Sequence, residues 1–250
     1  MDRFIYTALT GMNAAMDRQR TVANNLANSS TPGFRQEVFA VTPATLRDGS
    51  IEARALARGN VRGADMAPSR VNPTGQPLDL AVQGEALIAY QAPGAAGVGA
   101  EVYSRRGDLR VSATGVLENG EGLPVLGQGG PITVPAGFRI SIGGDGTVLA
   151  EDPTTPGQPP QQVDQIKLVS AEGSFLAKGI DSFLKVPGGG VLPPDPTAKV
   201  STGALEQSNV ETAQTLVDMI EAQRAFEQRA KIISTASELD EAGARLMSLR

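Results

Sequence analysis

The sequence predicts an α+β protein in which long helices at both chain ends enclose a β-rich middle. Helix-breaking residues are distributed unevenly: of the 29 glycines and 17 prolines, only Gly11, Gly33, Gly243 and Pro32 lie outside residues 36–205. Both outer segments carry apolar residues at helical spacing, whereas the middle alternates short apolar runs with turns. We expect the terminal helices to pair as a coiled-coil inner domain and the middle to form an antiparallel β-rich outer domain.

The apolar residues of the first segment share one face of a single helix. They recur at heptad spacing from Ile5 to Leu26, with a second apolar set in between. The helix is expected to stop at Pro32, which cannot continue it, and Gly33, which accepts positive φ. The residues expected to form an assembly interface here are Ile5, Leu9, Met12, Met16, Val22, Asn24, Asn25, Leu26 and Asn28.

The last segment predicts a second helix of about 35–40 residues, far longer than the usual ~11–12. Ser208 and Glu211 have the spacing of a capping box, with Ser208 as the N-cap, and no proline follows them. The interface residues expected on this helix are Leu216, Met219, Ile220, Phe226 and Ile233.

A helix of this length has two explanations. It either forms one arm of a hairpin packed on its own domain, or it projects from the domain and pairs with another helix. Two helices alone leave much of their apolar surface in water, so a projecting pair needs neighbouring chains to bury it. We favour projection and assembly.

The middle of the chain reads as short strands separated by glycine-rich turns. Residues 138–142 alternate apolar and polar side chains before residues 143–146, Gly-Gly-Asp-Gly, which have the composition of a hairpin tip. The expected domains are a helical inner domain of residues 1–35 and 206–250, a connecting segment of residues 36–75, a β-rich outer domain of residues 76–186, and a return linker of residues 187–205.

Composition excludes several classes of function. The chain has no cysteine and no histidine, which rules out disulfides, thiolate–zinc sites and His-dependent triads. Its net charge of −5 gives no electrostatic case for a nucleic-acid partner. The start has no basic and apolar signal-peptide pattern, and no apolar run is long enough to span a membrane. We expect no cofactor, no metal and no catalytic residue.

Two groups of motif residues have both a local structural interpretation and one that reaches beyond their own segment. Asn24 and Asn25 can bond near the end of the first helix or across to another chain, whereas Asn28 is expected at least to cap the helix. Residues 31–34 form the expected hinge: Thr31, Pro32 and Gly33 redirect the chain, and Phe34 anchors it in an apolar contact.

Two alternatives come from other classes. A carboxylate-dependent glycan hydrolase would need residues such as Asp145, Glu118 or Glu121, but these lie at expected turns, and aromatic residues make up only 4% of the chain. A secreted oligomeric adhesin or binding module would share the projecting helices but form a closed oligomer, whereas a filament subunit needs contacts that continue along a helix.

Several motifs resemble the rod and hook proteins of the bacterial flagellum. The run ANNLAN at residues 23–28, followed by TPGF at residues 31–34, is similar to the amino-terminal signature of this axial family. The runs MIEAQRAFE at residues 219–227 and KIISTA at residues 231–236 resemble its carboxy-terminal signature. LDLAVQG at residues 78–84 and YSRRG at residues 103–107 are similar to its β-domain motifs.

The resemblance implies a structural subunit of the flagellar basal-body rod, most similar to a proximal rod subunit, with a distal rod subunit as the alternative. It implies that the terminal helices line an axial channel, that the β domain faces outward, and that the chain polymerises with other rod subunits into the shaft between basal body and hook. It further implies export through the flagellar type III apparatus without a cleaved signal, and a location in the rod crossing the periplasm.

Overall fold

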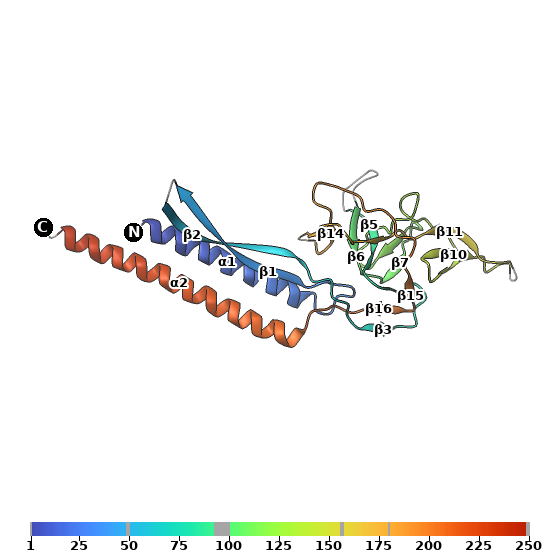
Figure 1. The fold of residues 1–250 in the computed structure, drawn as a ribbon. Helices are drawn as coiled ribbons and strands as arrows, with labels where there is room; N and C mark the ends of the chain where they lie inside the picture. The colour runs from blue at the N-terminus through green and yellow to red at the C-terminus, as the bar shows by residue number, and fades with distance from the viewer. Residues whose placement is uncertain (1, 49–50, 93–100, 156–157, 180, 249–250) are drawn as a thin grey trace. The chain divides into compact units, whose positions relative to one another are not determined.

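The computed structural model describes residues 2–48, 51–92, 101–155, 158–179 and 181–248. In these residues two helices, α1 (Asp2–Ala27) and α2 (Thr212–Ser248), lie at the two ends of the chain with β structure between them (Figure 1). This is compatible with the α+β class. The chain forms two units: unit 1 is Met1–Ala27, Glu37–Gly63 and Val210–Arg250, and unit 2 is Asn28–Gln36 and Ala64–Asn209.

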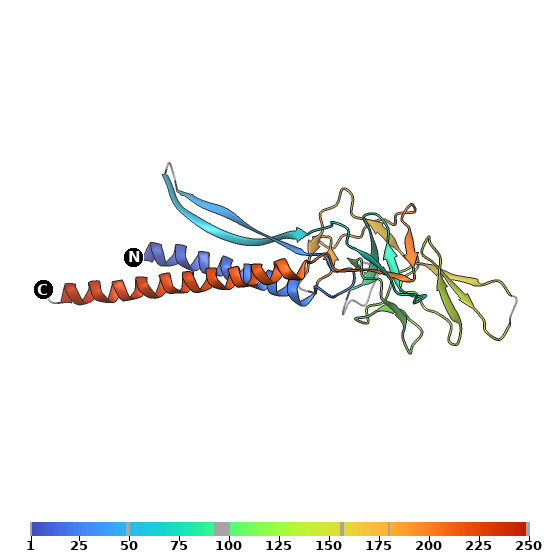
Figure 2. The same cartoon turned by 90° about the horizontal axis from the view of Figure 1, so that it is seen from below.

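Unit 1 consists of the two helices and a long hairpin. The helices run antiparallel, so that both chain ends lie at the same end of the unit (Figure 1). The hairpin pairs β1 (Glu37–Asp48) with β2 (Ile51–Ala64). The start of β1 is bonded to α1 through Glu37, and Figure 2 shows the hairpin curving away from the helices beyond that point. The sequence predicted only a connecting segment for residues 36–75, so the hairpin is a feature that sequence reasoning did not provide.

The predicted coiled coil between the terminal helices is wrong. α1 and α2 are separate helices without an interlocked seam, because the large stripe residues Leu9, Met16 and Leu216 remain 41%, 50% and 48% exposed. A coiled coil would insert such side chains as knobs into the partner helix. The most buried apolar side chains of the two helices are instead small, namely Ala14, Ala15 and Ala222, and α1 shares its surface with β1 as well as α2.

The predicted N-cap of the second helix is also wrong. α2 begins at Thr212 rather than next to Ser208. Its first backbone bond runs from the N–H of Thr215 to the carbonyl of Glu211 at 2.9 Å. The carbonyl of Ser208 accepts a hydrogen bond from the hydroxyl of Ser69 at 2.8 Å.

Within the residues that the structure describes, unit 2 is built from short antiparallel strands in five sheets. The largest has the order β12-β5-β6-β14-β13, formed by Leu168–Ser170, Ala86–Gln91, Glu101–Ser104, Leu184–Lys185 and Ala177–Lys178. A second has the order β11-β10-β9, formed by Gln161–Gln165, Thr147–Glu151 and Arg139–Ile142. The pairs are β16 with β3 (Ala204–Glu206, Val71–Pro73), β15 with β4 (Val200–Thr202, Leu80–Val82) and β7 with β8 (Leu109–Val111, Leu117–Asn119).

The core of unit 2 lies on both faces of the largest sheet. Along β5, Ile88 and Tyr90 pack into one apolar cluster, whereas Leu87 and Ala89 pack into a second one. Because both faces are buried, β5 has no polar side chain from Ala86 to Ala89 and does not alternate apolar with polar residues there.

The predicted hairpin tip is confirmed between β9 and β10. The carboxylate of Asp145 accepts hydrogen bonds from the backbone N–H of Thr147 at 3.0 Å and from its hydroxyl at 2.8 Å. Over the described residues, neither helix is long and apolar enough to cross a membrane, and no acidic cluster is placed to hold a metal ion.

Candidate assembly surface and motif turn

The predicted interface residues differ in how far the structure buries them. Val22 and Asn25 are buried within unit 1. Those that are exposed to solvent are Leu9, Met16, Leu216 and Ile220. Those that are half-buried are Met12, Asn24, Leu26, Asn28, Met219, Phe226 and Ile233. Ile5 lies in α1, and its side chain is outside the described part of the chain.

Further large apolar side chains are exposed on the same two helices. With the four exposed residues above, they form what we call the exposed apolar set: Tyr6, Leu9, Met16, Leu216, Val217, Ile220, Ile232 and Leu239. Burying one such side chain contributes roughly 1.5–3 kcal/mol. Apolar side chains exposed in number on one part of a protein commonly mark protein interaction sites. The set is therefore the candidate assembly surface of unit 1.

The two asparagines of the first motif bond within their own chain. Asn25 is buried, and its amide pairs with the backbone of Glu37: Oδ1 accepts from the N–H at 2.8 Å, and Nδ2 donates to the carbonyl at 3.1 Å. Asn24 Nδ2 donates to Glu37 Oε1 at 2.6 Å. Asn25 thus acts as a strand partner for the first residue of β1, and together the two amides hold the start of the hairpin against α1.

The motif turn in unit 2 needs a glycine at position 33 for two reasons. Gly33 has φ of 68°, the left-handed region that favours glycine. A Cβ atom there would come within 2.3 Å of the backbone of Arg105. The N–H of Gly33 donates to the carbonyl of Glu206 at 2.8 Å, and Thr31 bonds back to Asn28 through backbone and side chain. The turn therefore holds residues 31–34 tightly against the return strand β16.

Phe34, the expected anchor of the turn, is buried in unit 2. The ammonium group of Lys178 lies over its ring, 3.4 Å from the centroid, and donates a hydrogen bond to the carbonyl of Arg35. A cation over an aromatic face is favourable, so Lys178 of β13 stabilises the buried position of Phe34 and with it the turn.

A buried carboxylate shared by two arginines lies next to the turn. Glu206 Oε1 accepts from Arg35 Nη2 at 2.7 Å and from the N–H of Ser69 at 2.8 Å, and Oε2 accepts from Arg105 Nε at 2.6 Å. The side chains of Arg35, Arg105 and Glu206 are at most 3% exposed. We call Arg35, Arg105 and Glu206 the buried ion cluster.

The two arginines of the buried ion cluster are bonded unequally. Arg105 also donates to the carbonyls of Val82, Gly84 and Ala86. The guanidinium of Arg35 bonds to Glu206 through Nη2, and its Nε and Nη1 have no partner among the described residues. Arg105 therefore ties Glu206 to the loop between β4 and β5, whereas Arg35 contributes mainly its charge.

The charges of the cluster stabilise one another in the ionised form. Burial alone would raise the pKa of Glu206, but the hydrogen bond from Ser69, the charge of Arg105 and the hydrogen bonds from Arg105 and Arg35 outweigh it, so the pKa is lowered. Burial lowers the pKa of Arg35, and Glu206 partly offsets this effect. Glu206 is consequently ionised when folded and counters one of two buried positive charges.

Sequence reasoning missed the residues that fix the ends of the turn. Arg35, Arg105, Glu206 and Asn209 were not singled out. Asn209 Oδ1 accepts from the N–H of Gln36 at 2.7 Å, and its Nδ2 donates to the carbonyl of Asp65 at 2.9 Å. The position of Arg35 directly after the TPGF motif was the available signal.

Three protein families match successive parts of the chain. Residues 5–35 match the family described as "Flagella basal body rod protein". Residues 81–150 match "Flagellar hook protein FlgE/F/G D1 domain", and residues 201–246 match "Flagellar basal body rod FlgEFG protein C-terminal". The first and last of these regions contain most of α1 and α2, the motif turn and Glu206.

Characterised relatives match over the full length. The chain is 37% identical to the flagellar basal-body rod protein FlgF of Salmonella typhimurium, with 100% of each chain covered. It is 38% identical to FlgF of Escherichia coli, with 95% of each covered, and 28% identical to FlgG of Bacillus subtilis, with 96% of this chain and 97% of the relative covered. The chain therefore belongs to the family of flagellar basal-body rod proteins and is FlgF-like within it.

Proposed function

We propose that this chain is a structural subunit of the flagellar basal-body rod and that it assembles by burying the exposed apolar set against neighbouring subunits. The set carries the proposal, because a 37-residue helix with Leu216, Ile220 and Leu239 in water gains stability only when another surface covers these side chains. The names of the full-length relatives support the same assignment.

A structural role is also consistent with how the acidic residues of unit 2 are used. Asp145 is bonded to Thr147 at the hairpin tip, and Glu118 is paired with exposed Arg110 at 2.9 Å. Glu121 is paired with Arg106 at 2.5 Å. Each carboxylate considered for a glycan hydrolase is thus engaged in local structure, and the relatives carry the names of rod proteins rather than of enzymes.

The proposal extends to partners and location. The chain assembles with copies of itself and with other rod subunits, and it reaches the rod through the flagellar type III export apparatus. In the rod it belongs to the shaft that crosses the periplasm between basal body and hook. The helices, in residues 1–35 and 206–250, face the axial channel, and residues 76–186 face outward, joined to them by residues 36–75 and 187–205.

Deletion of the gene, followed by imaging of isolated basal bodies, tests the proposal. We expect a truncated rod, no hook and non-swimming cells, with full recovery when the intact gene is supplied in trans. Full-length rods and normal swimming in the deletion strain would show that the chain is not a rod subunit.

A further inference from the structure

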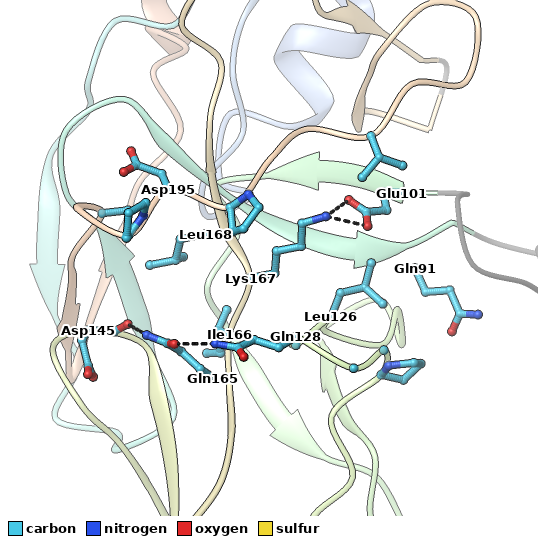
Figure 3. Close-up of a pocket in the computed structure, with 18 residues that line it drawn as sticks. Gln91, Glu101, Leu126, Gln128, Asp145, Gln165, Ile166, Lys167, Leu168 and Asp195 are labelled. Atoms are coloured by element: carbon cyan, nitrogen blue, oxygen red, sulfur yellow. Dashed lines mark hydrogen bonds and ion pairs between the residues drawn. The ribbon is translucent and has the colours of Figure 1, made fainter.

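Unit 2 contains an open groove of about 1040 Å³ whose polar groups are neutral or internally paired (Figure 3). Its floor is apolar and includes Leu126, Ile166 and Leu168. Its lining also includes Pro131, which follows the glycine-rich loop of residues 127–130, and Pro194. The volume is at the upper end of the range of about 300–1,000 Å³ that is usual for binding sites.

The charges at the rim of the groove are already satisfied within the chain. Lys167 Nζ contacts both carboxylate oxygens of Glu101 at 2.8 Å. The remaining polar surface consists of two carboxylates and a pair of amides. The carboxylates of Asp145 and Asp195 accept hydrogen bonds from Thr147 and Thr197. Gln128 Nε2 donates to Gln165 Oε1 at 3.0 Å, and Gln165 Nε2 donates to the carbonyl of Asp145 at 3.0 Å (Figure 3). The groove therefore favours a ligand without negative charge that carries amide groups and apolar bulk.

The same unit contains an uncharged segment that combines amide side chains with apolar prolines. Residues 158–162, Gln-Pro-Pro-Gln-Gln, belong to the β10–β11 hairpin, and all five are exposed. We call them the QPPQQ segment. Pro159 and Pro160 have no N–H group, so burying them against apolar walls leaves no unpaired donor. The flanking glutamines supply amides that can bond with Gln128 and Gln165.

The hairpin geometry keeps the QPPQQ segment away from the groove of its own chain. Gln165 lines the groove and pairs with Thr147 at the base of the hairpin. The ladder then runs to Ala150 and Gln161, about 10 Å further on at ~3.3 Å per residue. Figures 1 and 2 show β10 and β11 leading away from the rest of unit 2.

We propose that the groove of unit 2 binds the QPPQQ segment of a second copy of this chain. The inference rests on the proposed function, since a segment and a groove on one subunit form a heterologous contact that repeats from copy to copy along a polymer. An extended proline-containing segment suits such a groove because it is ordered before it binds and loses little conformational entropy.

Cysteine cross-linking in assembled rods tests this contact. The chain has no native cysteine, so the double variant Gln128→Cys/Gln161→Cys places one thiol in the groove and one on the QPPQQ segment. On mild oxidation we expect a ladder of covalent dimers and higher multimers, because docking brings the two sulfurs into disulfide range and raises their effective concentration to about the millimolar level.

The matched control is Gln83→Cys/Gln161→Cys, in which the first thiol sits on an exposed glutamine outside the groove. We expect at least about tenfold fewer multimers in this control, because a thiol outside the groove would meet the segment with an affinity at least about tenfold lower. Adding Pro159→Asp and Pro160→Asp to the groove variant should remove the ladder, because the new carboxylates would enter an apolar groove unpaired.

Three results would overturn the contact: no multimers above the control, a disulfide within one chain, or a covalent adduct with a different protein. The test separates this contact from the proposed function. Normal rods without the ladder would reject the groove contact alone, whereas full-length rods in the deletion strain would reject the rod assignment itself.

Discussion

Replacing Glu206 with Gln keeps the shape of the side chain but leaves two buried guanidinium groups without a counter-charge. Arg35 and Arg105 approach the carboxylate at 2.7 and 2.6 Å, and none of the three side chains has appreciable contact with solvent. Removing one partner of a buried ion pair costs about 3–5 kcal/mol, since the remaining charge cannot regain its hydration. We expect Glu206→Gln to lower the free energy of unfolding of unit 2 by this amount.

The matched control is Glu118→Gln, the same chemical change at a carboxylate that also pairs with one arginine. Its partner Arg110 is 59% exposed, and the pair is screened by water. Such surface pairs contribute about 0–1 kcal/mol. Urea unfolding followed by tyrosine fluorescence reports on unit 2, because Tyr90 and Tyr103 are fully buried there. Equal effects of the two substitutions would refute the reasoning.

The same cluster predicts how stability depends on pH. The pKa of Glu206 is lowered in the folded state, so its contribution is present above the unfolded pKa of about 4.3 and is lost as the pH falls through the folded value. The difference in unfolding free energy between wild type and Glu206→Gln should therefore be constant near neutral pH and shrink below about pH 4. A difference that grows on acidification would contradict this assignment.

Two further substitutions have matched controls in the chain. Gly33→Ala should destabilise unit 2 by more than about 2 kcal/mol, because the new Cβ combines positive φ with a backbone clash. The control Gly75→Ala also has positive φ but no atom near the new Cβ, so it should cost about 1 kcal/mol. Equal urea midpoints for the two variants would contradict this. Asn25→Ala should speed hydrogen exchange at the backbone amide of Glu37 at least about tenfold, as expected for the loss of about 1.4 kcal/mol. The control Asn13→Ala, on the exposed side of α1, should leave this exchange rate unchanged. Unchanged exchange in Asn25→Ala would show that the amide pair does not hold the hairpin.

The distribution of helix breakers was sufficient to predict the two terminal helices and the β-rich middle. Glycine and proline act locally, so their positions carry structural information without knowledge of tertiary contacts. The tip at residues 143–146 was predictable for the same reason, since Asp145 needs only Thr147 to form it.

Packing between elements was less predictable. An apolar stripe shows that a face can be buried but does not identify its partner, and here Ala14, Ala15 and Ala222 are buried while Leu9 and Leu216 are not. The β1–β2 hairpin was missed because its strands mix glycine, arginine and small apolar residues without clear alternation.

The buried ion cluster could not be predicted from the sequence alone. Arg35 and Glu206 are 171 positions apart, and Arg105 and Glu206 are 101 apart. Charged residues are usually exposed, and apart from the position of Arg35 directly after the TPGF motif nothing local distinguishes these three from the other charged residues of the chain. Only the fold brings the motif turn, the loop after β6 and the return strand β16 to one carboxylate.

The central claim, that neighbouring subunits bury the exposed apolar set, is tested most directly by Ile220→Asp. Ile220 is 53% exposed on α2, so the substitution should leave the urea unfolding of unit 2 unchanged in the isolated chain while placing a charge in the assembly surface. Imaging of basal bodies should then show truncated rods for Ile220→Asp and complete rods for the control Phe175→Asp, which replaces an equally large exposed residue of unit 2. Complete rods and normal swimming with Ile220→Asp would contradict the claim.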